Sequence, residues 1–133
     1  MDKRRYSREV INVSSNFFVE GASLGRREFE GTVADISECG VGIRIEDEKS
    51  VGIVSKIPDG SAISFQFVDE YELFGVVKTS VVYGKVSVVR KNVENGVTFL
   101  GCVIEKLDHD LEQYIHDKKL CGFRNRRFAV LGY

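Results

Sequence analysis

The sequence contains no tryptophan, one proline and one methionine, and its three cysteines are far apart. Because Cys39, Cys102 and Cys121 are odd in number and form no C-x-x-C pair, they argue against a disulfide framework or a zinc site and fit reduced thiols. No apolar run approaches the roughly 18 residues of a membrane-spanning helix. The N-terminus is charged with no hydrophobic stretch after it, so neither a signal peptide nor membrane insertion is expected, and the cytoplasm is the expected location.

Positive and negative charges are nearly balanced, and the net charge is −1. This balance argues against a protein that binds bulk nucleic acid. Four basic groups and one acidic group gather in residues 1–8, and three arginines follow at positions 124, 126 and 127. Local positive charge on a neutral-to-acidic body is typical of a site for a small anion.

Metal ligands and catalytic groups are equally scarce. His109 and His116 are the only histidines, and neither lies in a carboxylate–histidine cluster with metal-ligand spacing. No serine, cysteine or threonine has an identifiable base partner, and no pair of acids stands out. The sequence therefore predicts no metal, no cofactor and no enzymatic activity.

Most of the chain alternates apolar and polar residues with the period of two that is typical of half-buried strands. The pattern predicts strands over residues 9–19, 27–36, 41–46, 63–67 and 97–105, and one long bent strand or two short ones from 72 to 93. The polar stretch from residue 47 to 60, which contains the only proline, is expected to be a loop. Asn95-Gly96 is a hairpin turn signal, and Gly75 and Gly84 mark candidate bulges.

One helix is expected after the last strand. Asp108 is a candidate N-cap, Leu111 and Tyr114 recur at helical spacing, and Gly122 is expected to close the helix. Six short strands, one late helix and no βαβ alternation predict an all-β fold with a C-terminal helix, either an antiparallel barrel or a sandwich. The expected organisation is a flexible arginine-bearing arm at residues 1–9, one domain at 10–121, and a basic and aromatic tail at 122–133.

The joint between the second and third predicted strands carries residues suited to a purine base. Asp35 and Ser37 are two residues apart, so on an extended strand both side chains point to the same face. Gly40 and Gly42 give the backbone freedom for a tight turn or a close approach by a ligand. A carboxylate beside a hydroxyl suits the Watson–Crick edge of guanine, which presents N–H donors, while an arginine fork pairs with guanine O6 and N7.

The start of the chain supplies such forks. Arg4-x-x-x-Arg8 followed by Asp35-x-Ser37-x-x-Gly40 resembles the signature of the PilZ domain, the bacterial receptor for cyclic di-GMP. The resemblance covers most of the chain, and it implies a six-stranded antiparallel β-barrel with the C-terminal helix packed against it.

The resemblance also implies how the ligand is bound, with the arginine arm wrapping over it and the strand residues reading a guanine. Many family members stack a base on a tryptophan near the position of Val88-Val89-Arg90, and its absence here removes stacking worth roughly 1–3 kcal/mol. The implied ligand-binding residues are Arg4, Arg8, Asp35, Ser37 and Gly40, with Arg5, Arg44 and Arg90 as candidate secondary contacts.

The function implied by the resemblance is that of a cyclic di-GMP receptor and adaptor, which passes the second-messenger signal to an unidentified protein effector in motility, biofilm or polysaccharide control. Two alternatives stay open. One is a PilZ-like protein-interaction module with weak or no nucleotide binding. The other is a barrel that binds single-stranded nucleic acid through aromatic residues and a basic groove, against which the acidity of the body argues.

Overall fold

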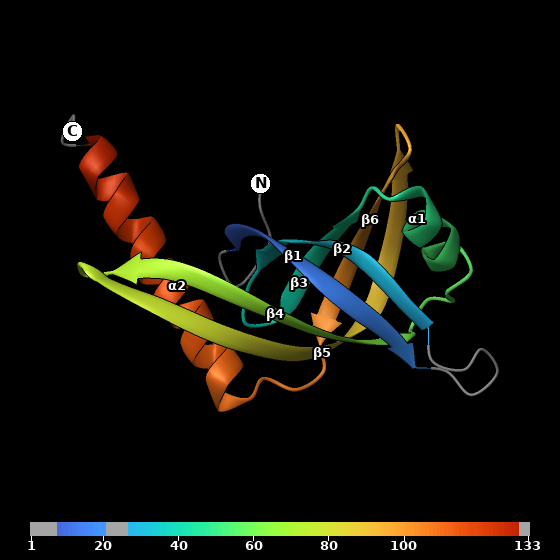
Figure 1. Cartoon of the computed structure of the whole chain (residues 1–133), viewed down its shortest axis with the longest axis horizontal. Helices are drawn as coiled ribbons and strands as arrows, with labels where there is room; N and C mark the ends of the chain where they lie inside the picture. The colour runs from blue at the N-terminus through green and yellow to red at the C-terminus, as the bar shows by residue number, and fades with distance from the viewer. Residues whose placement is uncertain (1–7, 21–26, 131–133) are drawn as a thin grey trace.

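The computed structural model describes residues 8–20 and 27–130, with side chains described as far as residue 121. Its elements are β1 (Glu9–Glu20), β2 (Arg27–Ile36), β3 (Gly40–Ile45), α1 (Glu48–Val54), β4 (Ala62–Leu73), β5 (Val76–Glu94), β6 (Val97–Ile104) and α2 (His109–Val130). All the strand pairs are antiparallel, and they close a barrel in the order β1-β2-β3-β6-β5-β4 (Figure 1). The predicted six-stranded antiparallel barrel with a C-terminal helix is confirmed.

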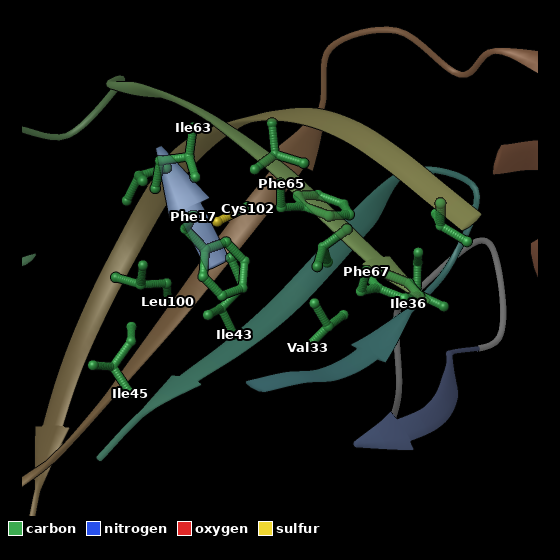
Figure 2. Packing of buried hydrophobic residues seen from close by; sticks show 14 of the residues in the cluster. Phe17, Val33, Ile36, Ile43, Ile45, Ile63, Phe65, Phe67, Leu100 and Cys102 are labelled. Atoms are coloured by element: carbon green, nitrogen blue, oxygen red, sulfur yellow. The ribbon is translucent and has the colours of Figure 1, made fainter. Parts of the chain in front are cut away.

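Apolar side chains of the alternating strands fill the interior of the barrel (Figure 2). Phe17 of β1 stacks on Phe29 of β2 with ring centroids 5.1 Å apart, and Phe65 stacks on Phe67 within β4 at 5.9 Å. Such aromatic pairs add about 0.5–1.5 kcal/mol to the stabilisation from burial alone. Because the core lies inside the barrel, the outward-pointing side chains that α1 and α2 do not cover are available for binding.

Strands β4 and β5 form a hairpin that extends beyond the barrel (Figure 1). β1 pairs with β4 only between residues 62 and 66, and β6 pairs with β5 only from residue 86 onward. Residues 67–84 therefore form a two-stranded extension, which we call the β4–β5 ribbon. Phe74 and Gly75 make its turn, with φ values of 51° and 80°. This conformation matches the two-residue hairpin turn with positive φ at both positions, so the bulge expected at Gly75 is wrong.

The bulge expected at Gly84 is also wrong, because Gly84 pairs with Phe65 without any shift of register. Gly84 instead makes room for the Phe65 ring, since a Cβ at this position would lie 2.3 Å from the ring carbon Cζ. We expect Gly84→Ala to lower the free energy of unfolding by about 1–3 kcal/mol, because the ring must leave its place in the packed core. Urea denaturation measures the change.

Gly52→Ala is the matched control for this prediction. Gly52 lies in α1, and no atom comes within 4 Å of the Cβ that the substitution would add. Alanine in place of a helical glycine is expected to stabilise by about 0.5–1 kcal/mol. If Gly84→Ala and Gly52→Ala changed the free energy of unfolding equally, the Phe65 ring would have moved away from the new Cβ without any loss of stability.

Helix α1 falls where the sequence predicted a loop, so that prediction is wrong. Asp47 caps the helix, since its carboxylate accepts a hydrogen bond of 2.9 Å from the Ser50 amide. Val54 is fully buried against the barrel. A helix of seven residues has too few turns to show a clear apolar period, which is why its sequence reads as a polar connection.

Helix α2 begins as predicted and ends later than predicted. The Asp108 carboxylate accepts a hydrogen bond of 2.8 Å from the Leu111 amide, which confirms the N-cap. The helix then runs through Gly122 to Val130, so the prediction that Gly122 ends it is wrong. A glycine inside a helix costs about 1 kcal/mol relative to alanine, which neighbouring helix-forming residues can offset.

A buried polar cluster holds α2 on the β4–β5 ribbon, behind which the helix passes in Figure 1. The Asp117 carboxylate accepts hydrogen bonds from Tyr71 Oη at 2.9 Å, Lys78 Nζ at 2.7 Å and Gln113 Nε2 at 3.0 Å. One turn earlier, Tyr114 Oη donates to Asp69 at 2.7 Å. The helix is therefore tied to the ribbon by directional bonds as well as by apolar packing.

Candidate functional site

Three of the residues implicated by the sequence meet where β1 begins. Glu9 pairs with Ile36, so Arg8, which immediately precedes the strand, lies beside the turn after β2. Arg8 Nη1 is 2.8 Å from Asp35 Oδ1. A Cβ on Gly40 would lie 3.2 Å from Arg8 Nη2, so the guanidinium lies directly over this glycine. The structure thus brings Arg8, from the first half of the predicted signature, next to Asp35 and Gly40, from the second half.

The Arg8–Asp35 pair is accessible to a ligand. The two side chains are 19% and 32% exposed, respectively. A guanidinium has five N–H donors and a carboxylate has several acceptor positions, so one shared hydrogen bond leaves both groups able to bind further partners. The pair therefore offers a donor and an acceptor side by side at the surface of the barrel.

Ser37 was expected to lie on the same exposed face as Asp35, but the structure places it elsewhere. Its side chain is buried, and Ser37 Oγ accepts hydrogen bonds from the amides of Gly40 at 3.2 Å and Cys39 at 3.4 Å. Serine commonly stabilises turns by bonding to the backbone in this way. In this structure, Ser37 shapes the turn that carries Gly40 and supports Arg8.

Two glycines make a flat floor next to Asp35. Gly42 of β3 pairs with Asp35 on one side and with Gly101 of β6 on the other. Gly101 in turn pairs with Arg90 of β5. A Cβ on Gly42 would come within 2.8 Å of Asp35 Oδ1, and one on Gly101 within 2.8 Å of Arg90 Nε. The row therefore runs Asp35, Gly42, Gly101, Arg90 across four strands, with the Asp35 carboxylate lying over Gly42 and the Arg90 side chain over Gly101.

Asp35 and Arg90, the two ends of this row, owe their positions to irregular strand pairing. The register of β2 against β3 shifts between Val33 and Asp35, and that of β5 against β6 shifts between Val88 and Arg90. A bulge changes which side chains face outward. Val89 and Arg90 are accordingly both exposed, although they are consecutive. The bulge at Val89 is what places Arg90 across from Gly101.

A pocket of about 150 Å³ lies over this row, and the side chains of Arg8, Asp35 and Arg90 line it together with the floor glycines. Asn92 and Phe99 also line it. No motif in the sequence marks these two residues or Gly101 as part of the site. Their neighbourhood depends on the register between β5 and β6, which the spacing of residues along the chain does not encode.

Arg44 lies outside this pocket. It lines a larger hollow of about 690 Å³ across the outer faces of β1, β2, β3 and β4. There Arg44 Nε donates to Glu46 at 2.7 Å, and Glu30 and Asp47 add further carboxylates to the lining. This hollow is poorly suited to a doubly anionic ligand, because its acidic groups outnumber the single arginine.

The turn of the site is connected to α2. Glu38, between Ser37 and Cys39, forms an ion pair with Lys119 Nζ, and the second carboxylate oxygen of Glu38 is buried. The two side chains are 26% and 28% exposed, so the pair is partly screened from water. No pattern in the sequence predicts this contact, because it joins residues 81 positions apart.

Arg4 and Arg5 lie outside the described residues. Among the residues that the structure describes, no group of three or more His, Cys, Asp and Glu side chains could hold a metal ion. Burial raises the pKa of the Cys102 thiol, next to the site, to about 12, so this thiol is protonated at neutral pH. No helix within the described part of the chain is long and apolar enough to cross a membrane.

Neither a known family profile nor a curated protein matches the sequence. Three solved structures resemble this one at probability 1.00. The inhibitor of motility from Bacillus subtilis (MotI/DgrA) is 14% identical, with a TM-score of 0.62 over 97% of this chain and 53% of its own, so the chain spans about half the length of that protein.

The other two structures are single PilZ domains. The PilZ domain of YcgR from Escherichia coli, solved with c-di-GMP, is 13% identical, with a TM-score of 0.55 over 99% of this chain and 100% of its own. The PilZ domain of CeSA from a cellulose-synthesising bacterium is 15% identical, with a TM-score of 0.50 over 89% of this chain and 98% of its own. The likeness that the two sequence motifs predict is therefore confirmed at the level of the fold: the chain has the fold of a PilZ domain.

Proposed function

We propose that this chain is a cytoplasmic receptor for cyclic di-GMP that passes the presence of the ligand to a protein partner. The observation that carries the proposal is the pocket in which Arg8 and Asp35 face Arg90 across the Gly42–Gly101 floor. The YcgR PilZ domain, whose fold this chain shares, was solved with c-di-GMP.

The base of the ligand fits the floor of the pocket. Gly42 and Gly101 add no side chains of their own to the floor, so a flat purine ring that displaces the Asp35 and Arg90 side chains lying over them would approach the backbone of β3 and β6 closely. Asp35 at the edge of the floor would accept hydrogen bonds from the N–H groups of guanine, which adenine does not present in the same positions. In this proposal Asp35 selects guanine, and Ser37 and Gly40 maintain the turn that admits it.

Arginines would neutralise the phosphates. Arg8 at one end and Arg90 at the other end of the row bring positive charge to both sides of the pocket. A planar guanidinium can pair with a phosphate in bidentate fashion or stack on a base, which lysine cannot do. Arg4, outside the described residues, is proposed to add a further phosphate contact, and Arg5 a secondary one.

The signal would leave the site through α2. Glu38 belongs to the turn that Arg8 covers, and its ion pair with Lys119 joins that turn to the helix. A ligand that shifts the turn would change the helix position, because a ligand redistributes a protein among its conformations according to its preference for each. The partner protein would recognise the altered surface.

Calorimetric titration of the full chain with cyclic di-GMP tests the proposal, with cyclic di-AMP as the matched ligand. We expect micromolar or tighter binding of cyclic di-GMP and binding of cyclic di-AMP at least about tenfold weaker, since Asp35 would lose its guanine donors. Raising the salt concentration should reduce affinity only slightly, because about two phosphates are neutralised.

Other results would identify the alternatives. The absence of heat from a folded protein would contradict the proposal and support a protein-interaction module. Equal binding of both dinucleotides would contradict the role of Asp35. A steep salt dependence, together with tighter binding of oligonucleotides, would support a barrel for single-stranded nucleic acid.

A further inference from the structure

The β4–β5 ribbon presents one strand edge that is unusually suited to pairing with another strand. β5 pairs with β4 on one side along residues 76–84, while its pairing with β6 begins only at Val86. The other side of β5 along residues 76–84 is therefore a free edge. Backbone N–H and C=O groups on such an edge are a template for a further strand.

The hairpin turn shows which backbone groups point to this edge. Leu73 and Val76 flank the two-residue turn and so form the closest hydrogen-bonded pair. Hydrogen bonds alternate along an antiparallel pair, so Val77, Thr79, Val81 and Tyr83 direct their N–H and C=O groups away from β4. The opposite edge obeys the same alternation, because the Glu72 carbonyl accepts a hydrogen bond of 3.2 Å from Cys121 Sγ and not from β5.

The two edges of the ribbon differ in protection. The β4 edge from residue 67 to 73 carries three acidic residues, and Cys121 and Lys118 of α2 contact it. The β5 edge from residue 76 to 84 has one charged residue, Lys78, whose ammonium lies 2.7 Å from Asp117 on the inner side. Natural edge strands usually avoid pairing by means of charges, prolines or bulges, and the β5 edge has none of these except the neutralised Lys78.

The outer face of the same segment is apolar. Val77, Val81 and Tyr83 are 63%, 47% and 57% exposed, and Val68, across from Val81 on β4, is 58% exposed. Val68, Val81 and Tyr83 adjoin one another, and Val77 is separated from them by Thr79; exposed apolar clusters of this kind are typical of an interaction site. This apolar strip and the free edge belong to one strand, so a partner strand would cover both.

We infer that a second copy of this chain pairs with the β5 edge, so that two ribbons join into one four-stranded antiparallel sheet. A twofold axis at Ser80 places Val77 opposite Tyr83 of the second copy and Thr79 opposite Val81. All four are residues whose backbone groups point to the edge, and no like charges face each other. The β4 edge could not pair with itself in this manner, because its acidic residues would meet.

The arrangement would add to the support that the ribbon has outside the barrel. A two-stranded hairpin is marginally stable alone, and either further strands or a helix packed on it stabilises it. Each ribbon already has α2 on its inner face. With the axis perpendicular to the sheet, both helices would lie on the same side and both apolar strips on the other.

Sedimentation equilibrium of the full chain, without nucleotide, tests this inference. We expect the 15.0 kDa chain to reach twice that mass as its concentration rises. Val81→Lys puts a charge on each side of the new strand pair, and we expect it to raise the dissociation constant about tenfold or more. Val68→Lys, at a somewhat more exposed position on the same face but one strand further from the edge, is the control and should change it by about twofold at most.

A second variant separates edge pairing from contact between faces. Thr79→Pro removes an N–H that points to the free edge and spares those that pair with β4, so it should yield a folded monomer. A wild-type chain that stays monomeric at all concentrations would overturn the inference. So would equal weakening by Val68→Lys and Val81→Lys, or a Thr79→Pro variant that is folded and still dimeric.

Discussion

Arg8→Ala is expected to weaken the binding of cyclic di-GMP about 10- to 100-fold. Arg8 is the described arginine that both covers Gly40 and pairs with Asp35. Its removal deletes a hydrogen bond to a charged group, worth about 1.5–3 kcal/mol. It also leaves the Asp35 carboxylate without its cation, at the place where the phosphates would approach in the proposed complex. Calorimetric titration of the folded variant measures the change.

Arg44→Ala is the matched control for this variant. Arg44 is also a partly buried arginine on the barrel surface, 2.7 Å from its own carboxylate partner, Glu46. Because it lies in the other hollow, its removal should change the affinity by no more than about twofold. Equal losses in both variants would mean that the net charge of the protein, and not the Arg8 site, governs binding. An unchanged affinity in Arg8→Ala would remove the central residue of the proposal.

The sequence predicts the barrel well wherever a strand has one buried face. β2 extends from Arg27 to Ile36, as its alternation predicts, and the Asn95-Gly96 turn has the positive φ values of a two-residue hairpin. The ribbon was less predictable, because its outer face is apolar and the alternation disappears between residues 76 and 84. The turn at Phe74-Gly75 was hard to predict for a different reason, because phenylalanine rarely adopts positive φ.

The candidate site was predictable in part. The spacing of Arg8, Asp35 and Gly40 relates them only through a known family pattern, and the structure explains their proximity by the pairing of Glu9 with Ile36. Gly101 carries no motif of its own. It becomes part of the floor because β3 is hydrogen-bonded to β6 with Gly42 opposite Gly101. Cross-strand register of this kind results from the closed barrel as a whole, and a single sequence does not reveal it.

Ser37 shows how one residue type supports two interpretations. Serine in a turn can bind a ligand or can bond to its own backbone, and the residue pattern is the same in both cases. Here the hydroxyl bonds to the amides of Cys39 and Gly40. Its buried position supports a role in shaping the turn for Arg8, and a ligand that bonded to it directly would have to open that turn.

Asp117→Asn is expected to lower the free energy of unfolding by about 1–3 kcal/mol at neutral pH. Asp117 is buried and accepts hydrogen bonds from Tyr71, Lys78 and Gln113. The amide keeps the size of the side chain but loses the charge and one acceptor, so the Lys78 ammonium loses its counterion. Lys78 is 41% exposed and can be hydrated, which keeps the cost below that of a fully buried unpaired charge.

The pH dependence of this effect follows from the pKa of Asp117. Burial raises the pKa of the carboxyl, but the hydrogen bonds from Lys78, Gln113 and Tyr71 outweigh burial, and the pKa lies below its ordinary value. A carboxyl with a lowered pKa in the folded state stabilises that state above the pKa of the unfolded chain, near 3.9, and loses this contribution as the pH falls through the lower, folded value.

Urea denaturation of the wild type and of Asp117→Asn across the acidic range tests the prediction. The difference between them should be full at neutral pH, should begin to shrink below about pH 4, where this carboxyl takes up a proton in the unfolded chain, and should be lost as the pH falls through the lower pKa of the folded state. Glu112→Gln, on an exposed face of the same helix, should stay close to the wild type throughout. A difference for Asp117→Asn that persists unchanged into acid would mean that its charge does not hold α2 on the ribbon, and that apolar packing around Tyr71 and Tyr114 alone fixes the helix.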